Sequence, residues 1–128
     1  MEKPLLLVVE DEPLLHLAIE DALEEAGYAV LFVSSGDAAT TELDADAARF
    51  KGVITDIRLG SKISGWQVAQ RAREHTPEMP VVYMTGDSAH DWASKGVPNS
   101  LILQKPFAMA QLVTAISQLI NGGTGTQI

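Results

Sequence analysis

The chain has 128 residues, the usual size of one domain, and its content of 46% hydrophobic and 20% charged residues is typical of a folded globular protein. Its formal net charge of −8 disfavours binding to nucleic acids or anionic membrane surfaces, because both require clustered Lys and Arg. With no cysteine, disulfides, thiolate metal sites and cysteine nucleophiles are excluded. The longest apolar run, Tyr28 to Val33, is too short to cross a bilayer and the amino terminus lacks signal-peptide character, so we expect a cytoplasmic location.

Apolar runs alternate with helical patterns along the chain, and this alternation predicts a parallel sheet wrapped by helices. The first run covers residues 5–9 and is followed by Pro13, which suits the first position of a helix. Apolar residues then recur at helical spacing up to Gly27, a plausible helix stop. A second strand is predicted at residues 29–33, and a weaker helix begins after Ser35, a favourable N-cap.

That second helix is predicted to reach Leu43, where an Asp- and Ala-rich stretch obscures its end. A short third strand at about residues 52–55 leads into a loop and then a helix at about residues 65–75. Further apolar runs predict a fourth strand at residues 81–84 and a fifth at residues 101–103. Continuous apolar runs of this kind are typical of strands buried on both faces of a parallel sheet.

The stretch between the fourth and fifth strands looks helical only at residues 90–95, before Gly96 and Pro98 interrupt it. We therefore expect a short or irregular fourth helix. The last helix is predicted from an apolar face made of Met109, Leu112, Val113, Ile116 and Ile120. We expect one domain over residues 1–121 and a flexible tail over residues 122–128.

Polar residues follow four of the predicted strands at their carboxyl ends. Glu10 and Asp11 follow the first strand, Asp56 the third, Thr85 the fourth and Lys105 the fifth. These ends of parallel strands meet at one edge, so the side chains should lie together. Two carboxylates about 4 Å apart repel by on the order of 4 kcal/mol at an effective dielectric constant near 20, so three of them require a cation. Mg²⁺ suits such an oxygen-only site, whereas zinc prefers His or Cys.

A site of this composition suits phosphoryl chemistry. Asp56 stands alone after a central strand and is the best placed nucleophile, which would form an aspartyl phosphate. Glu10 and Asp11 would hold Mg²⁺. Lys105 and Thr85 would then contact the oxygens of the phosphoryl group.

The motifs VVEDEP, VITDIRLG, MTG and QKPF, in this order and spacing, resemble the receiver domains of two-component response regulators. The resemblance covers residues 4 to about 121. It implies an α/β fold of the flavodoxin-like, doubly wound kind, with five parallel strands in the order 2-1-3-4-5, and a cis bond before Pro106. It also implies that the Arg58 backbone carbonyl is a metal ligand, that Gly86 leaves room for phosphate, and that Thr85 and Lys105 are the switch hydroxyl and amine.

Three features depart from the family pattern. Glu10 is longer than the Asp more often found there, and Ile102 stands where the family often has a switching Tyr or Phe. The stretch from Thr85 to Lys105 is also short, which shrinks the fourth helix. Arg58 and Asp87 lie two residues beyond Asp56 and Thr85 and are candidates to pair across the mouth of the site, where they would restrict hydrolytic water.

The resulting hypothesis is a signalling module, not an enzyme. A histidine kinase or histidine phosphotransfer protein phosphorylates Asp56, and an unidentified protein target, or a second copy of the chain in a homodimer, binds according to the phosphorylation state. The main alternative is a pseudo-receiver that works as an interaction module without phosphorylation. Flavodoxin-like cofactor binding is disfavoured because the acidic loop at Glu10 repels a phosphate. A haloacid-dehalogenase-type phosphatase is disfavoured because Arg58 stands where that family needs a second Asp.

Overall fold

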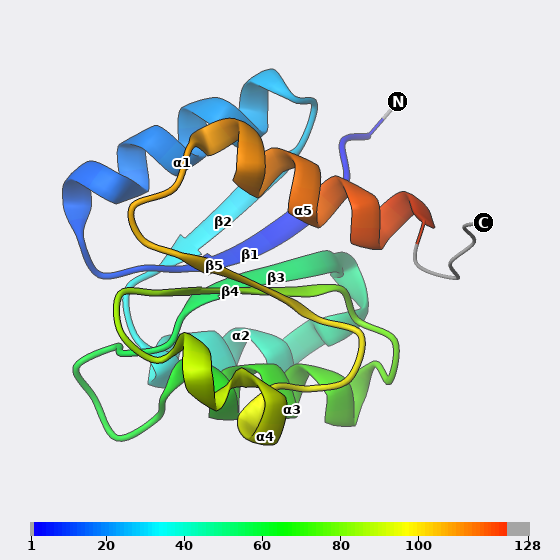
Figure 1. The fold of residues 1–128 in the computed structure, drawn as a ribbon. Helices are drawn as coiled ribbons and strands as arrows, with labels where there is room; N and C mark the ends of the chain where they lie inside the picture. Colours follow the sequence, from blue (N-terminus) through cyan, green and yellow to red (C-terminus); the bar gives the residue numbers. More distant parts are fainter. Residues whose placement is uncertain (1, 123–128) are drawn as a thin grey trace.

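A computed structural model describes residues 2–122 and shows strands and helices alternating along the chain (Figure 1). The strands are β1 (Leu5–Val9), β2 (Ala29–Val33), β3 (Phe50–Asp56), β4 (Val81–Thr85) and β5 (Leu101–Gln104). The α-helices are α1 (Pro13–Glu25), α2 (Gly36–Asp46), α3 (Gly65–His75), α4 (Trp92–Lys95) and α5 (Met109–Gly122), and two 3-10 turns, Ala47–Arg49 and Ala89–Asp91, precede β3 and α4. The strands form one sheet in the order β2-β1-β3-β4-β5 with every pair parallel, which confirms the predicted flavodoxin-like topology.

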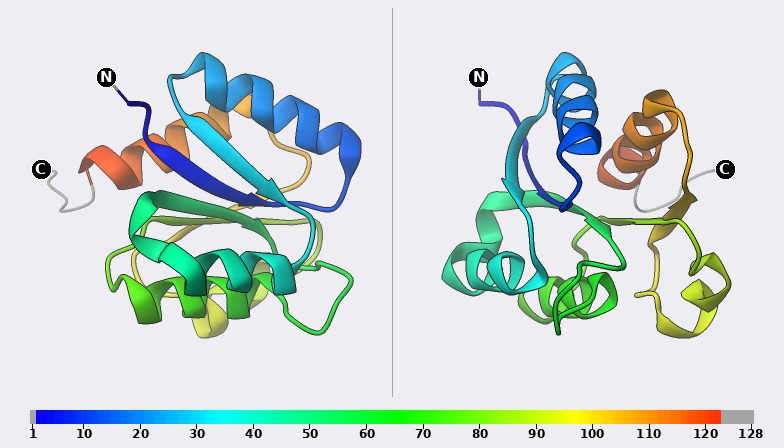
Figure 2. Two further views of the ribbon diagram at one scale, coloured as in Figure 1. Left: turned by 180° about the vertical axis from the view of Figure 1, so that it is seen from behind. Right: turned by 90° about the vertical axis from the view of Figure 1, so that its left-hand side faces the viewer.

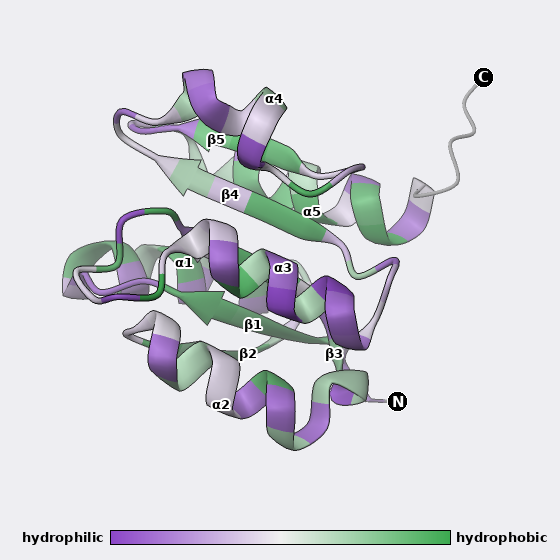
Figure 3. Ribbon diagram, turned by 90° about the horizontal axis from the view of Figure 1, so that it is seen from below, coloured by the Kyte–Doolittle hydropathy of each residue, from purple (hydrophilic) through white to green (hydrophobic). Residues whose placement is uncertain are grey.

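The sheet lies between two layers of helices. Helices α1 and α5 cover one face, and α2, α3 and α4 cover the other (Figures 1 and 2). Strands β1, β3 and β4 are therefore buried on both sides, as their uninterrupted apolar sequences predicted. The helices of the α2 and α3 layer alternate between polar and apolar residues in Figure 3, because each has one face toward solvent and one toward the sheet.

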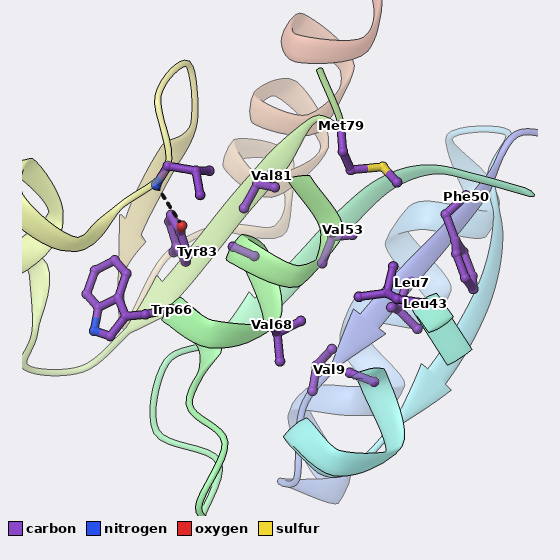
Figure 4. Close-up of a cluster of buried hydrophobic side chains, with 14 of the residues drawn as sticks. Leu7, Val9, Leu43, Phe50, Val53, Trp66, Val68, Met79, Val81 and Tyr83 are labelled. Atoms are coloured by element: carbon purple, nitrogen blue, oxygen red, sulfur yellow. Dashed lines mark hydrogen bonds between the residues drawn. The ribbon is translucent and has the colours of Figure 1, made fainter. Parts of the chain in front are cut away.

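Each face of the sheet has its own hydrophobic core. On the α1 and α5 face, Ile19 and Leu23 pack with Leu112 and Ile116 over the strands. The core on the opposite face contains Leu7, Val9, Leu43, Phe50, Val53, Trp66, Val68, Met79, Val81 and Tyr83 (Figure 4). Because burial of apolar area is the main favourable term in folding, these two cores hold the strands in register and so position the residues at the strand ends.

Local sequence signals explain where the helices begin. Pro13 occupies the first turn of α1, and the Ser35 hydroxyl caps α2 by accepting a hydrogen bond from the Ala38 N–H at 3.0 Å. Ser64 and Gln67 form a reciprocal capping box at the start of α3. These caps satisfy backbone groups that the first turn of a helix leaves without partners.

Two element boundaries differ from the sequence prediction by more than one residue. Helix α2 continues past Leu43 to Asp46, because its Asp- and Ala-rich end contains no Gly or Pro to stop it. Strand β3 begins at Phe50 instead of Gly52, since Phe50 is buried and pairs with Leu5 across a register shift in β1. Pairing with a strand distant in sequence decides where β3 begins and ends, and the short apolar run in the sequence does not indicate these positions.

The region between β4 and β5 contains only the 3-10 turn Ala89–Asp91 and the four-residue helix α4, which confirms the predicted short fourth helix. The bond between Lys105 and Pro106 is cis, as the resemblance implied. Helix α5 includes Gly122, and residues 123–128, the rest of the predicted tail, lie outside the described residues. Over residues 2–122, no helix combines the length and apolar character needed to cross a membrane.

Candidate functional site

Acidic side chains meet at the carboxyl ends of β1 and β3. Asp56 is the last residue of β3, is 7% exposed, and its Oδ1 accepts a hydrogen bond of 2.8 Å from the Ile57 N–H. Glu10 directly follows β1, is 2% exposed, and its Oε2 accepts a hydrogen bond of 2.9 Å from the Glu12 N–H. The two carboxylates are therefore held by backbone groups of their own loops and oriented toward one another.

Lys105 joins the two carboxylates. Its Nζ lies 3.1 Å from Asp56 Oδ2 and 3.5 Å from Glu10 Oε1. The backbone N–H of Lys105 donates to the Thr85 carbonyl at 2.7 Å, which fixes the end of β5 against the end of β4. Residues far apart in the sequence thus form one charged cluster, as the strand-end argument predicted.

The environment shifts the ionisation of all three groups. Burial raises the pKa of the Asp56 carboxyl, although the hydrogen bond from Lys105 opposes this, and burial likewise raises the pKa of Glu10 against the hydrogen bond from the Glu12 backbone. Burial acts to lower the pKa of Lys105, but the hydrogen bonds and charges of Asp56 and Glu10 together outweigh it, so that the pKa of Lys105 is raised. Lys105 therefore keeps its positive charge, whereas burial disfavours the negative charges of Asp56 and Glu10. An additional cation would stabilise these two carboxylates in their charged form.

Glu10, Asp11 and Asp56 each offer a carboxylate oxygen, and these oxygens all lie within 4.8 Å of one another. Asp11 is exposed, which leaves this side of the cluster open to solvent. Gly60 lies beside it, because a Cβ at Gly60 would be 3.7 Å from Asp11 Oδ2. An oxygen-only group with one open side fits a hard divalent cation that retains waters, as Mg²⁺ does, better than it fits zinc.

The start of α3 packs closely against the backbone of Asp56. A Cβ at Gly65, the first residue of α3, would lie 2.1 Å from the Asp56 carbonyl oxygen, so any larger residue here would force the backbone to shift. The Gly65 N–H also donates to the Ile57 carbonyl at 2.9 Å. The start of α3 is therefore pressed against the end of β3 and limits the movement of Asp56.

Thr85 is buried at the end of β4, and its hydroxyl accepts hydrogen bonds within the turn that follows this strand. Thr85 Oγ1 accepts hydrogen bonds from the Ser88 N–H at 2.8 Å and the Asp87 N–H at 3.2 Å. A Cβ at Gly86 would meet no atom within 4 Å, so the space beside it is open. Sequence reasoning missed the Ser88 contact, although a Thr followed within three residues by Asp and Ser is a typical hydroxyl-capped turn.

Arg58 and Asp87 form an ion pair, with Nη2 to Oδ2 at 2.8 Å and Nε to Oδ1 at 3.2 Å. Their side chains are 77% and 52% exposed, so solvent screening leaves the pair with little energy of its own. The pair links the loop after β3 to the loop after β4. The suggested effect on water, and the Arg58 carbonyl as a metal ligand, remain predictions.

Comparison with known proteins agrees with this arrangement. The model of the response regulator receiver domain family matches residues 6–117. The structure is similar to the crystal structure of a response regulator receiver protein from Sinorhizobium medicae, with a TM-score of 0.90, 51% sequence identity, and coverage of 94% of this chain and 96% of that one.

Curated relatives differ in length. The chain is 29% identical to the response regulator receiver protein CpdR of Brucella abortus over 90% of its own length and 95% of the relative's. It is 28% identical to the transcriptional regulatory protein QseB of Haemophilus influenzae over 91% of its own length, but it spans only 52% of that relative. With its fold, its cluster of acidic residues at the strand ends and its match over residues 6–117, the chain belongs to the response regulator receiver domain family of two-component signalling.

Proposed function

We propose that Asp56 accepts a phosphoryl group from a phosphohistidine on a histidine kinase or a histidine phosphotransfer protein. An Asp56 carboxylate oxygen forms a bond to phosphorus while the bond between phosphorus and the donor's histidine nitrogen breaks. The imidazole keeps the electron pair of that bond and takes up a proton. The observation that carries this proposal is the contact of 3.1 Å between Lys105 Nζ and Asp56 Oδ2, within a cluster of three carboxylates.

The neighbouring groups have defined parts in this proposal. Glu10, Asp11 and Asp56, with the Arg58 carbonyl, would hold Mg²⁺, which when bound offsets the negative charge on the transferring oxygens. Lys105 then pairs with the phosphoryl oxygens as well as with Asp56. Phosphorylation adds negative charge at a place where burial already disfavours charge. The contacts with Lys105 and Mg²⁺ would offset this charge and so stabilise the aspartyl phosphate.

The signal passes on through Thr85. Its hydroxyl turns from the Asp87 and Ser88 amides to a phosphoryl oxygen, and Gly86 leaves the space that this oxygen needs. The movement changes the loop after β4 and so shifts the balance between two surface conformations. A partner protein that binds one of them more tightly reads the phosphorylation state, with a coupling of typically about 1–3 kcal/mol.

The donor protein must cover the edge of the sheet at which Asp56 lies. In the part of the chain that the structure describes, the exposed large hydrophobic side chains are Leu14 and Leu17, at 77% and 59% exposure, in the first two turns of α1. Helix α1 begins three residues after Glu10, so this apolar pair flanks the site. Contiguous exposed leucines mark interaction surfaces, and here they are available to a helical donor protein.

The ion pair between Arg58 and Asp87 would limit the approach of water to the aspartyl phosphate. We expect Arg58→Ala and Asp87→Ala to hydrolyse the aspartyl phosphate faster than the native chain, as measured by the decay of the phosphorylated mass. A variant of another exposed ion pair, Glu42→Ala, controls for loss of charge. Equal decay rates in all four proteins would leave Arg58 and Asp87 as two ordinary surface charges.

Intact mass after incubation with acetyl phosphate, with and without Mg²⁺, tests the central proposal. The native chain should gain one phosphoryl mass only with Mg²⁺, and Asp56→Asn should gain none. Binding of Mg²⁺ is measured separately as a rise in melting temperature, which should shrink in Asp11→Asn. The exposed Asp21 of α1 lies away from the cluster, so Asp21→Asn should behave as the native chain in both assays.

A pseudo-receiver that binds partners without phosphorylation is the second candidate. Ile102 in the position of the family's switching aromatic residue, together with the four-residue helix α4, favours it. Failure of phosphorylation by acetyl phosphate and also by a cognate histidine kinase would establish this candidate over the first.

A further inference from the structure

The chain has a buried aromatic hydroxyl beside the position where Ile102 replaces the family's usual aromatic residue. Tyr83 of β4 is the direct cross-strand partner of Ile102 on β5. Its side chain is fully buried in the core that faces α3 and α4, with its ring centroid 4.8 Å from that of Trp66 (Figure 4). Tyr83 is therefore too tightly packed to act as a rotating side chain, but its hydroxyl is well placed to hold a neighbour.

That neighbour is the chain that follows α4. The Val97 N–H donates a buried hydrogen bond of 3.0 Å to the Tyr83 hydroxyl, drawn as the dashed line in Figure 4. Burial raises the pKa of Tyr83 above its ordinary value of 10.0, so the oxygen accepts this bond as a neutral phenol. A bond that joins residues 14 apart in sequence ties the end of the α4 region to the middle of β4.

A second contact holds the same residue from the other side. The Ser100 hydroxyl donates to the Val97 carbonyl at 2.6 Å and accepts from the Trp92 indole N–H at 2.9 Å. A Cβ at Gly96 would lie 2.4 Å from the Trp92 ring, so the ring packs directly against that glycine. The N–H and the carbonyl of Val97 are thus both hydrogen-bonded, and the Ser100 hydroxyl links Val97 to Trp92.

The opposite end of the same region is held by Thr85. Its hydroxyl binds the amides of Asp87 and Ser88, as described above. Side chains alternate across a strand, so Thr85 and Tyr83, two residues apart, point to the same face of β4. Residues 87–97, which we name the α4 segment, are therefore attached to one strand by two hydroxyls, one at each end.

The two attachments differ in their relation to the phosphorylation site. Thr85 lies at the strand end beside Asp56 and Lys105, whereas Tyr83 lies one pleat deeper in the hydrophobic core. From this difference we infer that the α4 segment moves as a flap that phosphorylation releases at Thr85 and that stays hinged at the Tyr83–Val97 hydrogen bond. The release step rests on the proposed function, whereas the hinge contact does not.

Amide hydrogen exchange measured residue by residue tests the hinge in the unphosphorylated protein. Tyr83→Phe keeps the ring and removes the hydroxyl, so exchange at Val97 should quicken by about tenfold while Asp87 and Ser88 are unchanged. Thr85→Ala should give the reverse pattern. Tyr28→Phe is the matched control, because that hydroxyl bonds Ser117 of α5 at 2.7 Å, away from the α4 segment.

Phosphorylation of the native chain with acetyl phosphate then tests the release. Exchange at Asp87 and Ser88 should quicken, whereas Val97 should stay protected; in phosphorylated Tyr83→Phe, all three amides should exchange quickly. The inference is overturned if Val97 responds to Tyr83→Phe no more than to Tyr28→Phe, or if phosphorylation exposes Val97 as much as Ser88. A chain that gains no phosphoryl mass refutes the proposed function and the release step, while the unphosphorylated variants still decide whether Tyr83 is the hinge.

Discussion

Asp56→Asn should make the chain more stable in the absence of Mg²⁺, although it removes the central residue of the site. The substitution keeps the shape of the side chain, and its amide oxygen can still accept the hydrogen bond from Ile57. What changes is the charge at a side chain that is only 11% exposed. The sign and size of the effect follow from the groups around it.

Attraction to Lys105 at 3.1 Å is on the order of 5 kcal/mol at an effective dielectric constant near 20. Repulsion from a carboxylate within 4.8 Å is at least about 3.5 kcal/mol at the same dielectric constant; this applies to Glu10, and the repulsion from Asp11 is weaker because Asp11 is exposed. These terms nearly cancel, which leaves the cost of burying a carboxylate as the deciding term, in agreement with the raised pKa of Asp56. We therefore expect Asp56→Asn to gain about 1–3 kcal/mol in the free energy of unfolding at neutral pH.

Urea unfolding at pH 7 in a chelator, followed by tryptophan fluorescence, measures this gain. With a slope of about 1.5–2 kcal/mol per molar urea, the midpoint should rise by roughly 1 M. Mg²⁺ at ten times its dissociation constant should then stabilise the native chain by about 1.4 kcal/mol and the variant by less, because a ligand has been lost. Asp21→Asn carries the same charge change on exposed α1 and should stay within about 0.5 kcal/mol of the native chain. An unfolding midpoint for Asp56→Asn at or below the native value would refute the reasoning.

Three further predictions concern other parts of the molecule. Hydrogen bonds from Arg71 and His75 hold the pKa of Asp44 below its ordinary value of 3.8. The contribution of Asp44 to stability is therefore complete above that pH and is lost progressively on further acidification. The difference in unfolding free energy between the native chain and Asp44→Asn should accordingly be present at about pH 5 and become smaller as the pH falls below about 4. Leu17→Ser should slow phosphorylation by a histidine kinase several-fold and leave phosphorylation by acetyl phosphate unchanged, and equal slowing with both donors would contradict a docking role. Gly65→Ala should cost about 2–4 kcal/mol in urea unfolding, because the new Cβ meets the Asp56 carbonyl, whereas Gly86→Ala, which meets nothing within 4 Å, should cost far less.

The succession of strands and helices along the chain can be read from the sequence because it depends on local patterns, whereas their order in the sheet was implied by the family resemblance. Continuous apolar runs marked the central strands, Pro13, Ser35 and Gly27 marked helix ends, and Gly96 and Pro98 marked the short α4. The meeting of Glu10, Asp56 and Lys105 also followed, since the carboxyl ends of parallel strands share one edge whatever the details of packing.

Tertiary structure alone decided which atoms touch. The start of β3 at Phe50 depends on a register shift against β1. The sequence offered Arg58 and Asp87 only as candidates to pair, and whether they meet depends on how two loops lie relative to one another. Nothing in the pattern around Tyr83 distinguishes it from any other buried strand residue, yet its hydroxyl holds Val97. Hydrophobic periodicity specifies which face of an element is buried, whereas a hydrogen bond between distant residues depends on distances of a few tenths of an ångström, which the packing of the whole domain determines.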